Sequence, residues 1–233
     1  MRAVFFKELN HYFTSLTGYI YLSIQVLLCG AIFTSGNLLT QNSDIKSFFS
    51  SVFSILVFLI PLLTMRQFSE EKKMRTHQLL FTLPLSTEGI VAGKYLATLT
   101  VAAGGLAATL IYPLILGLYG SFQPLVSIGN YTGILLLLSG VIAIGLFVSS
   151  VSENQVISAI LSYAVIIFLW LADTLAPLLL GGRLTGIINI FSLRGNYIEF
   201  TYGIFNPAAL IYYLAVTLLF LFLTVVVLDS RRQ

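Results

Sequence analysis

The residues that come closest to a ligand-binding motif are Gly89, Gly93 and Lys94, in the segment GIVAGK. Glycines followed by a lysine hold nucleotide phosphates in P-loops, where backbone N–H groups and the lysine ammonium surround the anion. Here the segment is one residue short of G-x-x-x-x-G-K-[ST], continues with Tyr95, and precedes an apolar segment instead of following a strand. We therefore predict that it is not a nucleotide site.

The sequence contains few residues of the types that other kinds of catalysis use. The chain has 2 histidines, His11 and His77, and 1 cysteine, Cys29. No H-E-x-x-H motif occurs, and a single thiol supports neither a disulfide framework nor a thiol-rich metal site. The apolar segments carry no series of ionisable residues such as a proton relay needs. Asp173 lies near the end of one of them, and we interpret it as structural. We predict no catalytic residue, no metal and no cofactor, and hence no enzyme.

Charged residues gather instead in residues 66–94, which we call the polar segment. Its charged members are Arg66, Glu70, Glu71, Lys72, Lys73, Arg75, Glu88 and Lys94. We predict a helix over Ser69–Leu80, with Ser69 as its N-cap and two glutamates at the positive end of the helix dipole. Glu71 and Arg75 are spaced to pair four residues apart. Pro84 then ends this helix, and Ser86 with Glu88 caps the next one.

A charged connection between two apolar segments is often no more than a solvated loop. This one is long for a connector, and it carries Leu79, Leu80 and Phe81, which a passive loop does not need. We therefore favour the interpretation that the polar segment docks onto a cytoplasmic partner.

The composition is that of a membrane protein with several spans. Hydrophobic residues make up 58% and charged residues 9%, and the mean hydropathy is +0.96. Ordinary soluble domains are about 45–50% apolar and about 25% charged. The net charge of +3 is small and the basic residues are dispersed, which does not favour nucleic acid as a partner. A retained first span is expected rather than a cleaved signal peptide.

The hydrophobic pattern predicts one interfacial helix and six spans. Within residues 1–15, the segment 2–13 places mainly Phe, Leu and Tyr on one face and Lys7, Asn10 and His11 on the other, as in helices that lie on a membrane surface. The six spans, each near the roughly 20 residues that cross a bilayer, are Gly18–Thr34, Phe48–Met65, Tyr95–Tyr119, Tyr131–Val151, Val156–Leu180 and Ala208–Leu228.

Three connecting features complete the prediction. Small residues four apart, Ala103 with Ala107 and Gly104 with Ala108, favour close helix packing. The residues Ser152–Gln155 form a tight hairpin whose tip, Glu153, is either a second partner contact or simply solvated. Residues 181–207 form an irregular amphiphilic segment, expected as pieces of helix at the outer interface, and Asn206 with Pro207 begins the last span.

Basic residues are unevenly distributed between the two predicted sides of the membrane. The side with both termini and the polar segment holds Arg2, Lys7, Arg66, Lys72, Lys73, Arg75, Lys94, Arg231 and Arg232, and the other side holds Lys46, Arg183 and Arg194. Cytoplasmic loops carry the excess of Lys and Arg. Both termini and the polar segment are therefore expected in the cytoplasm, with the protein in the cell membrane.

Several motifs together resemble the membrane subunits of ABC-2 type transporters. They are Lys7-Glu8-Leu9 in the amphipathic helix, R-Q-F-S-E-E, T-x-Q-L-L-x-T-x-P-x-S and I-V-x-G-K in the polar segment, and a basic C-terminus. Phe191-Ser192-Leu193-Arg194-Gly195 is similar to a segment of the gliding-motility-type permeases. The resemblance covers essentially the whole chain as a single permease domain, residues 1–233, and the polar segment is its most specific part.

The resemblance implies an all-α membrane protein with a type V exporter-like fold. Such a subunit dimerises with a second permease, identical or different, and sits on two copies of a cytoplasmic ABC ATPase. The loop between spans two and three acts as a coupling helix. Carried onto this chain, the coupling interface comprises Glu70, Glu71, Arg75, Thr76, Leu79 and Leu80, with Glu153 at a second, smaller contact. Membrane lipids surround the spans.

Two functional hypotheses follow, and a third is disfavoured. In the first, the chain is the permease of an ATP-driven exporter, and charge reversal at Glu70 and Glu71 uncouples ATP hydrolysis without unfolding the protein. In the second, it is a membrane scaffold that anchors a cytoplasmic complex and transports nothing. Co-purification of a P-loop ATPase distinguishes them. An intramembrane enzyme is disfavoured because the sequence offers no nucleophile–base or metal constellation.

Overall fold

The computed structural model describes residues 1–42, 44–74, 86–119, 124–180 and 191–230, except for the side chains of Tyr119, Asp173 and residues 175–180. Every regular element within these residues is a helix. Among the described residues, six helical segments are long and apolar enough to cross a membrane, namely residues 16–38, 45–73, 87–118, 124–151, 155–172 and 207–230. The prediction of an all-α membrane protein with six spans is confirmed.

The central element of the bundle is α8 (Pro124–Val151). All of its residues from Leu137 to Leu146 are buried, as expected of a helix that is apolar on every side. It packs against α3 (Ile45–Thr64), α6 (Thr87–Ala108), α9 (Gln155–Leu180) and α12 (Pro207–Ser230). A Cβ atom at Gly145 would lie 2.1 Å from Oγ1 of Thr64, so this glycine lets the end of α3 approach α8 closely.

The third span differs from its prediction at both ends. It begins at Thr87 rather than Tyr95, because Ser86 caps it by accepting a hydrogen bond of 3.2 Å from the Gly89 N–H. The predicted cap by Ser86 is thus confirmed, but residues 87–94 belong to the span. The helix is interrupted after Ala108 and resumes as α7 (Ile111–Tyr119). Pro113 explains the interruption, since proline lacks an amide hydrogen and crowds the carbonyl one turn back.

The first span, α2 (Leu16–Phe33), ends in a π-helical turn, η1 (Thr34–Leu38). Its buried face includes Tyr21, Gln25 and Cys29, at a spacing of four residues. Gln25 lies over α6, where a Cβ atom at Gly105 would be 2.2 Å from its Oε1. The predicted small-residue pairs do not make a packing contact of this kind: Gly104 faces open space, and Ala107 and Ala108 are exposed.

The segment before the last span is partly helical. Residues 181–190 lie outside the described residues, and α11 (Leu193–Thr201) follows, capped by the Ser192 hydroxyl, which accepts from the Gly195 N–H at 2.9 Å. This helix packs on α8 and α9. The start of α12 is as predicted, with Asn206 Oδ1 accepting from the Ala208 N–H at 2.8 Å and Pro207 in the first helical position.

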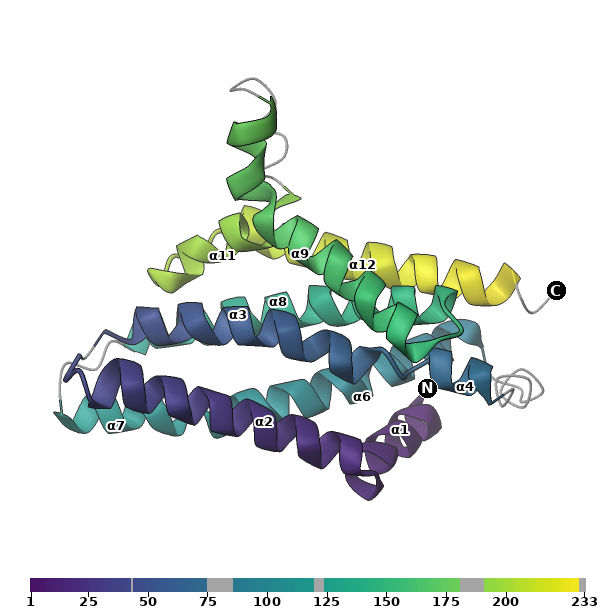
Figure 1. Cartoon of the computed structure of the whole chain (residues 1–233), viewed down its shortest axis with the longest axis horizontal. Coiled ribbons are helices and arrows are strands. Elements are labelled where there is room, and N and C mark those ends of the chain that lie inside the picture. The colour runs from purple at the N-terminus through teal and green to yellow at the C-terminus, as the bar shows by residue number, and fades with distance from the viewer. Residues whose placement is uncertain (43, 75–85, 120–123, 181–190, 231–233) are drawn as a thin grey trace.

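The helices of the bundle run side by side, so that connections collect at its two ends (Figure 1). One end, at the right of Figure 1, carries α1 (Arg2–Thr14), α4 (Ser69–Lys73), the start of α6, the turn between α8 and α9, and the last residues of α12. We call it the charged end. The predicted interfacial helix and the described part of the polar segment therefore lie together.

Candidate functional site: the charged end of the bundle

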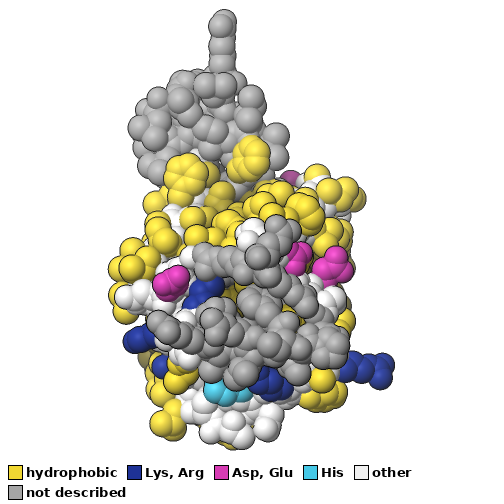
Figure 2. Space-filling view, turned by 90° about the vertical axis from the view of Figure 1, so that its right-hand side faces the viewer, with side chains coloured by type: hydrophobic (Ala, Val, Ile, Leu, Met, Phe, Trp, Pro, Cys, Tyr) yellow, Lys and Arg dark blue, Asp and Glu magenta, His cyan; other side chains and the backbone are white. Residues whose placement is uncertain are grey.

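Seen from the charged end, the described surface shows both acidic and basic side chains, together with a histidine (Figure 2). Hydrophobic side chains surround this area. The residues that sequence analysis assigned to a coupling interface divide here into two groups. Glu70, Glu71 and Glu153 are described, whereas Arg75, Thr76, Leu79 and Leu80 lie outside the described residues.

The cap of α4 is not the one predicted. Ser69 is the first residue of the helix, preceded by Phe68, and its hydroxyl donates back to the Met65 carbonyl. Ser149, near the end of α8, takes the capping role: its Oγ accepts from the N–H groups of Phe68 at 3.0 Å and Ser69 at 3.2 Å. It also donates to the Met65 carbonyl at 3.1 Å. Helix α4 is therefore capped by a neighbouring span rather than by its own sequence.

The two predicted contact segments are brought together by direct contacts. Arg66 Nε donates to Gln155 Oε1 at 3.4 Å, which joins the end of α3 to the start of α9. The Lys72 ammonium donates to the Ser150 carbonyl, so α4 also touches the end of α8. Glu153, at the tip of the turn, is exposed. The described residues 66–74 of the polar segment thus lie against the residues at and beside the 152–155 turn.

Sequence analysis missed the most deeply buried charge of this region. Lys94 is 1% exposed, and its ammonium donates to Glu8 at 3.1 Å, to Glu71 at 2.8 Å and to the Gln67 carbonyl at 2.9 Å. An ammonium has three N–H donors, so these three acceptors satisfy it fully. Together Glu8, Glu71 and Lys94, which we call the ion cluster, join α1, α4 and α6.

The burial of Glu8 adds a charged residue to the face of α1 that packs on the bundle. The buried residues of this helix are Val4, Glu8 and Tyr12, spaced four apart, whereas Phe6 and Phe13 of the predicted apolar face are exposed. The stripe packs on α6, where a Cβ atom at Gly93 would come within 2.9 Å of the Val4 side chain. In the sequence, Glu8 lies midway between Val4 and Tyr12 at a spacing of four residues. An acidic residue in such an otherwise apolar helical stripe is a signal that could have indicated a buried basic partner.

A network of neutral hydrogen bonds extends the ion cluster. The Tyr12 hydroxyl contacts Thr98 Oγ1 at 3.1 Å and accepts from the amide of Gln67. Burial raises the pKa of Tyr12 well above its usual value, so the hydroxyl stays neutral and serves only as a hydrogen-bonding group. The network fixes α1 against the end of α3 and against α6.

Glu70 and Glu71 occupy different environments. The Glu71 side chain is 18% exposed and bound to Lys94, whereas the Glu70 side chain is 34% exposed and lies 3.5 Å from Arg66 Nε. Removing one member of a buried ion pair leaves an uncompensated charge and is strongly destabilising, whereas surface pairs contribute little. Only Glu70 can therefore be reversed in charge without disturbing the buried cluster.

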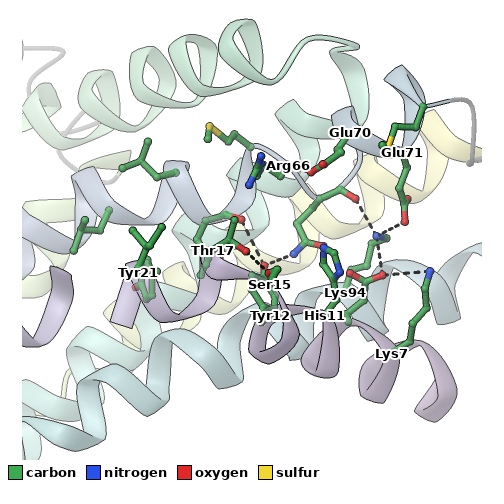
Figure 3. Close-up of a pocket in the computed structure, with 18 of the residues that line it drawn as sticks. Lys7, His11, Tyr12, Ser15, Thr17, Tyr21, Arg66, Glu70, Glu71 and Lys94 are labelled. Atoms are coloured by element: carbon green, nitrogen blue, oxygen red, sulfur yellow. Dashed lines mark hydrogen bonds and ion pairs between the residues drawn. The ribbon is translucent and has the colours of Figure 1, made fainter. Parts of the chain in front are cut away.

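A cavity of about 460 Å³ lies beside the ion cluster (Figure 3). Polar side chains of α1, the 65–74 segment and Lys94 line one part of it, and apolar side chains of α2 and α3 line the other. Ser15 and Thr17, between these parts, bond to each other through their hydroxyls at 2.7 Å. The described residues hold no group of three or more His, Cys, Asp or Glu able to bind a metal.

The sequence was compared with families of known proteins and with individual curated proteins. The chain matches no curated protein. The family described as ABC-2 family transporter protein matches residues 18–228, from the start of the first span to the end of the last. This range includes the polar segment and the 152–155 turn. The chain belongs to the ABC-2 transporter family and is a multi-pass membrane permease component of it.

Proposed function

We propose that this chain is the membrane-spanning subunit of an ATP-driven ABC-2 exporter, in which a separate ATPase supplies the energy. The observation that carries the proposal is that residues 66–73 lie against the helix ends on both sides of the 152–155 turn, through the Arg66–Gln155 and Lys72–Ser150 contacts. Two segments that must meet the same partner need to lie on the same face. The chain itself is a non-catalytic permease.

The subunit composition that we propose rests on the family resemblance, and the membrane topology rests on the distribution of basic residues. Two ATPase copies and a second permease, identical or different, complete the exporter, and the whole chain acts as one permease domain of the gliding-motility type. Both termini and residues 66–94 face the cytoplasm, because the basic residues lie mainly on that side. Residues 181–207 lie at the outer interface.

In this mechanism ATP binding closes the ATPase dimer and displaces the coupling helix that begins at Ser69. Glu70, Glu71, Arg75, Thr76, Leu79 and Leu80 form its contact, with Glu153 beside it. Because Lys94 binds both Glu71 and Glu8, a displacement of α4 carries α1 and α6 with it. The ATPase thereby biases a two-state arrangement of the spans.

The decisive test is purification of the tagged chain in mild detergent with mass spectrometry of its partners. We expect a P-loop ATPase in equal amount and its loss when Leu79 and Leu80 are both replaced by Ala. Recovery of the stable, folded chain with no ATPase would reject the proposal in favour of the scaffold hypothesis.

A further inference from the structure

The face of α2 that packs inside the bundle carries polar side chains. Tyr21 and Gln25, four residues apart, are 5% and 0% exposed, and Cys29 is fully buried one turn further along. Helices α2 and α6 lie side by side (Figure 1), and the Gln25 amide lies against Gly105 of α6, where a Cβ atom would be 2.2 Å from its Oε1. We call this contact, around Gln25 and Gly105, the α2–α6 seam.

The polar atoms of Tyr21 and Gln25 have no hydrogen-bond partner among the described residues. An unpaired buried group carries the full cost of its desolvation, and such groups are exceptions that require an explanation. The buried amide of Asn130 on α8 is different: it donates to the Val126 carbonyl at 2.8 Å and accepts from the Tyr197 hydroxyl at 3.0 Å. Polar side chains that lack partners in one arrangement of a protein can gain them in another.

The two sides of the seam are tied to different parts of the bundle. Helix α6 is joined to α1 and α4 by the ion pairs of Lys94 with Glu8 and Glu71. Helix α2 packs on α3 and is connected to α1 through Ser15, whose backbone is extended (φ −95°, ψ 156°). Residues at the ends of helices commonly act as hinges. The group formed by α1, α4 and α6 can therefore move relative to α2, with the change in direction taken up at Ser15.

We propose that the protein has a second arrangement in which α6 separates from α2 along the seam and water reaches Tyr21 and Gln25. Water then supplies the missing hydrogen bonds, which offsets the loss of contact between the two helices. The inference rests on the proposed function only for what drives the opening, namely displacement of α4 by the ATPase. The opening itself is a property of the chain, so the second arrangement is also populated, to a smaller extent, in the isolated chain.

The native thiol of Cys29 reports on the opening, because the chain has 1 cysteine. N-ethylmaleimide reacts with the thiolate, which forms where water reaches the sulfur. The measurement is the rate of modification of the purified full chain in detergent, followed by mass spectrometry. The control is Ala143→Cys in a Cys29→Ser chain, at a fully buried position of α8. Because local opening costs less than global unfolding, we expect Cys29 to react at least about tenfold faster than this control.

Matched variants shift the opening in both directions. Gly105→Ala introduces a Cβ atom against the Gln25 amide and should accelerate Cys29 modification several-fold, whereas the adjacent Gly104→Ala, which faces open space, should not. Gln25→Leu removes the unpaired amide and should slow the modification about tenfold without lowering the thermal unfolding temperature. Asn130→Leu removes a partnered amide, so it should lower the unfolding temperature and not slow the modification.

Two results would overturn the proposal. One is an equal rate of Cys29 modification in wild type, Gln25→Leu and Gly105→Ala. The other is modification of the Ala143→Cys control as fast as that of Cys29, since both thiols would then react through global unfolding. In the complex with the ATPase, ATP and orthovanadate should accelerate Cys29 modification. The expected pattern in the isolated chain, with no effect of ATP in the complex, would support the opening of the seam and reject the proposed coupling.

Discussion

Two sets of buried polar side chains differ in how completely they are partnered. In the ion cluster, Lys94 has an acceptor for each of its three N–H groups. On the neighbouring helix α2, the Tyr21 hydroxyl has no partner among the described residues. The comparison separates two kinds of buried polar group: satisfied groups join helices, whereas an unsatisfied group retains the cost of its desolvation.

The largest expected effect comes from removing the central charge of the ion cluster. Lys94→Met leaves Glu8 and Glu71 buried beside each other without the ammonium, which should destabilise the fold by about 3–5 kcal/mol. Thermal unfolding in detergent measures this loss. The matched control is Lys7→Met, whose exposed ammonium contributes at most about 1 kcal/mol.

A double variant sharpens the same prediction. Adding Glu8→Gln to Lys94→Met removes one of the two stranded carboxylates, so the combined loss of stability should be smaller than the sum of the two single losses, by about 0.5–3 kcal/mol. Strict additivity would show that the two residues do not interact in the folded protein.

An intermediate effect is expected at the cap that α8 supplies to α4. Ser149→Ala removes the acceptor of the Phe68 and Ser69 N–H groups, both in buried residues, and should cost about 1–3 kcal/mol. Hydrogen exchange of these two amides should accelerate in the variant. The neighbouring Ser150→Ala variant serves as the control, because its hydroxyl donates to the Phe147 carbonyl of its own helix, and an equal acceleration there would contradict the assigned cap.

The smallest effect tests the unpartnered hydroxyl directly. Tyr21→Phe should change stability by less than about 0.5 kcal/mol, because no hydrogen bond is lost, whereas Tyr12→Phe should cost about 1 kcal/mol. Thermal unfolding of the two variants side by side gives the difference. If Tyr21→Phe proves the more destabilising, its hydroxyl is already partnered and the contrast between the two groups fails.

Much of the fold could be predicted from the sequence, because a membrane-spanning segment or a helix cap depends mainly on residues that are neighbours in the chain. Asn206 with Pro207 and Ser86 mark helix starts that the structure confirms. The role given to Ser69 was wrong because a serine of α8 competes for the same N–H groups, and no local pattern contains that information. Lys94 was assigned to the polar segment that docks onto a partner, because its own partner Glu8 lies on a different helix, distant in sequence.

The candidate site, like the fold, has features that the sequence predicts and features that only the structure shows. The sequence identifies charged segments that can contact a partner, and the structure shows that Glu71 is held inside the protein while Glu70 lies nearer the surface. The sequence predicted that charge reversal at both glutamates leaves folding intact. We now expect this only for Glu70, because Glu71 binds the buried Lys94. The remaining members of the interface, Arg75 to Leu80, stay predictions of the family resemblance.

The most direct test of the account is the ATPase activity of the purified complex carrying Glu70→Lys. We expect unchanged thermal stability of the chain and retained ATPase co-purification, with stimulation of ATP hydrolysis by the chain reduced about tenfold or more. Glu199→Lys on α11, distant from the charged end, should behave as wild type (Figure 1). Full stimulation in the Glu70→Lys complex would contradict the claim that this surface couples the permease to its ATPase.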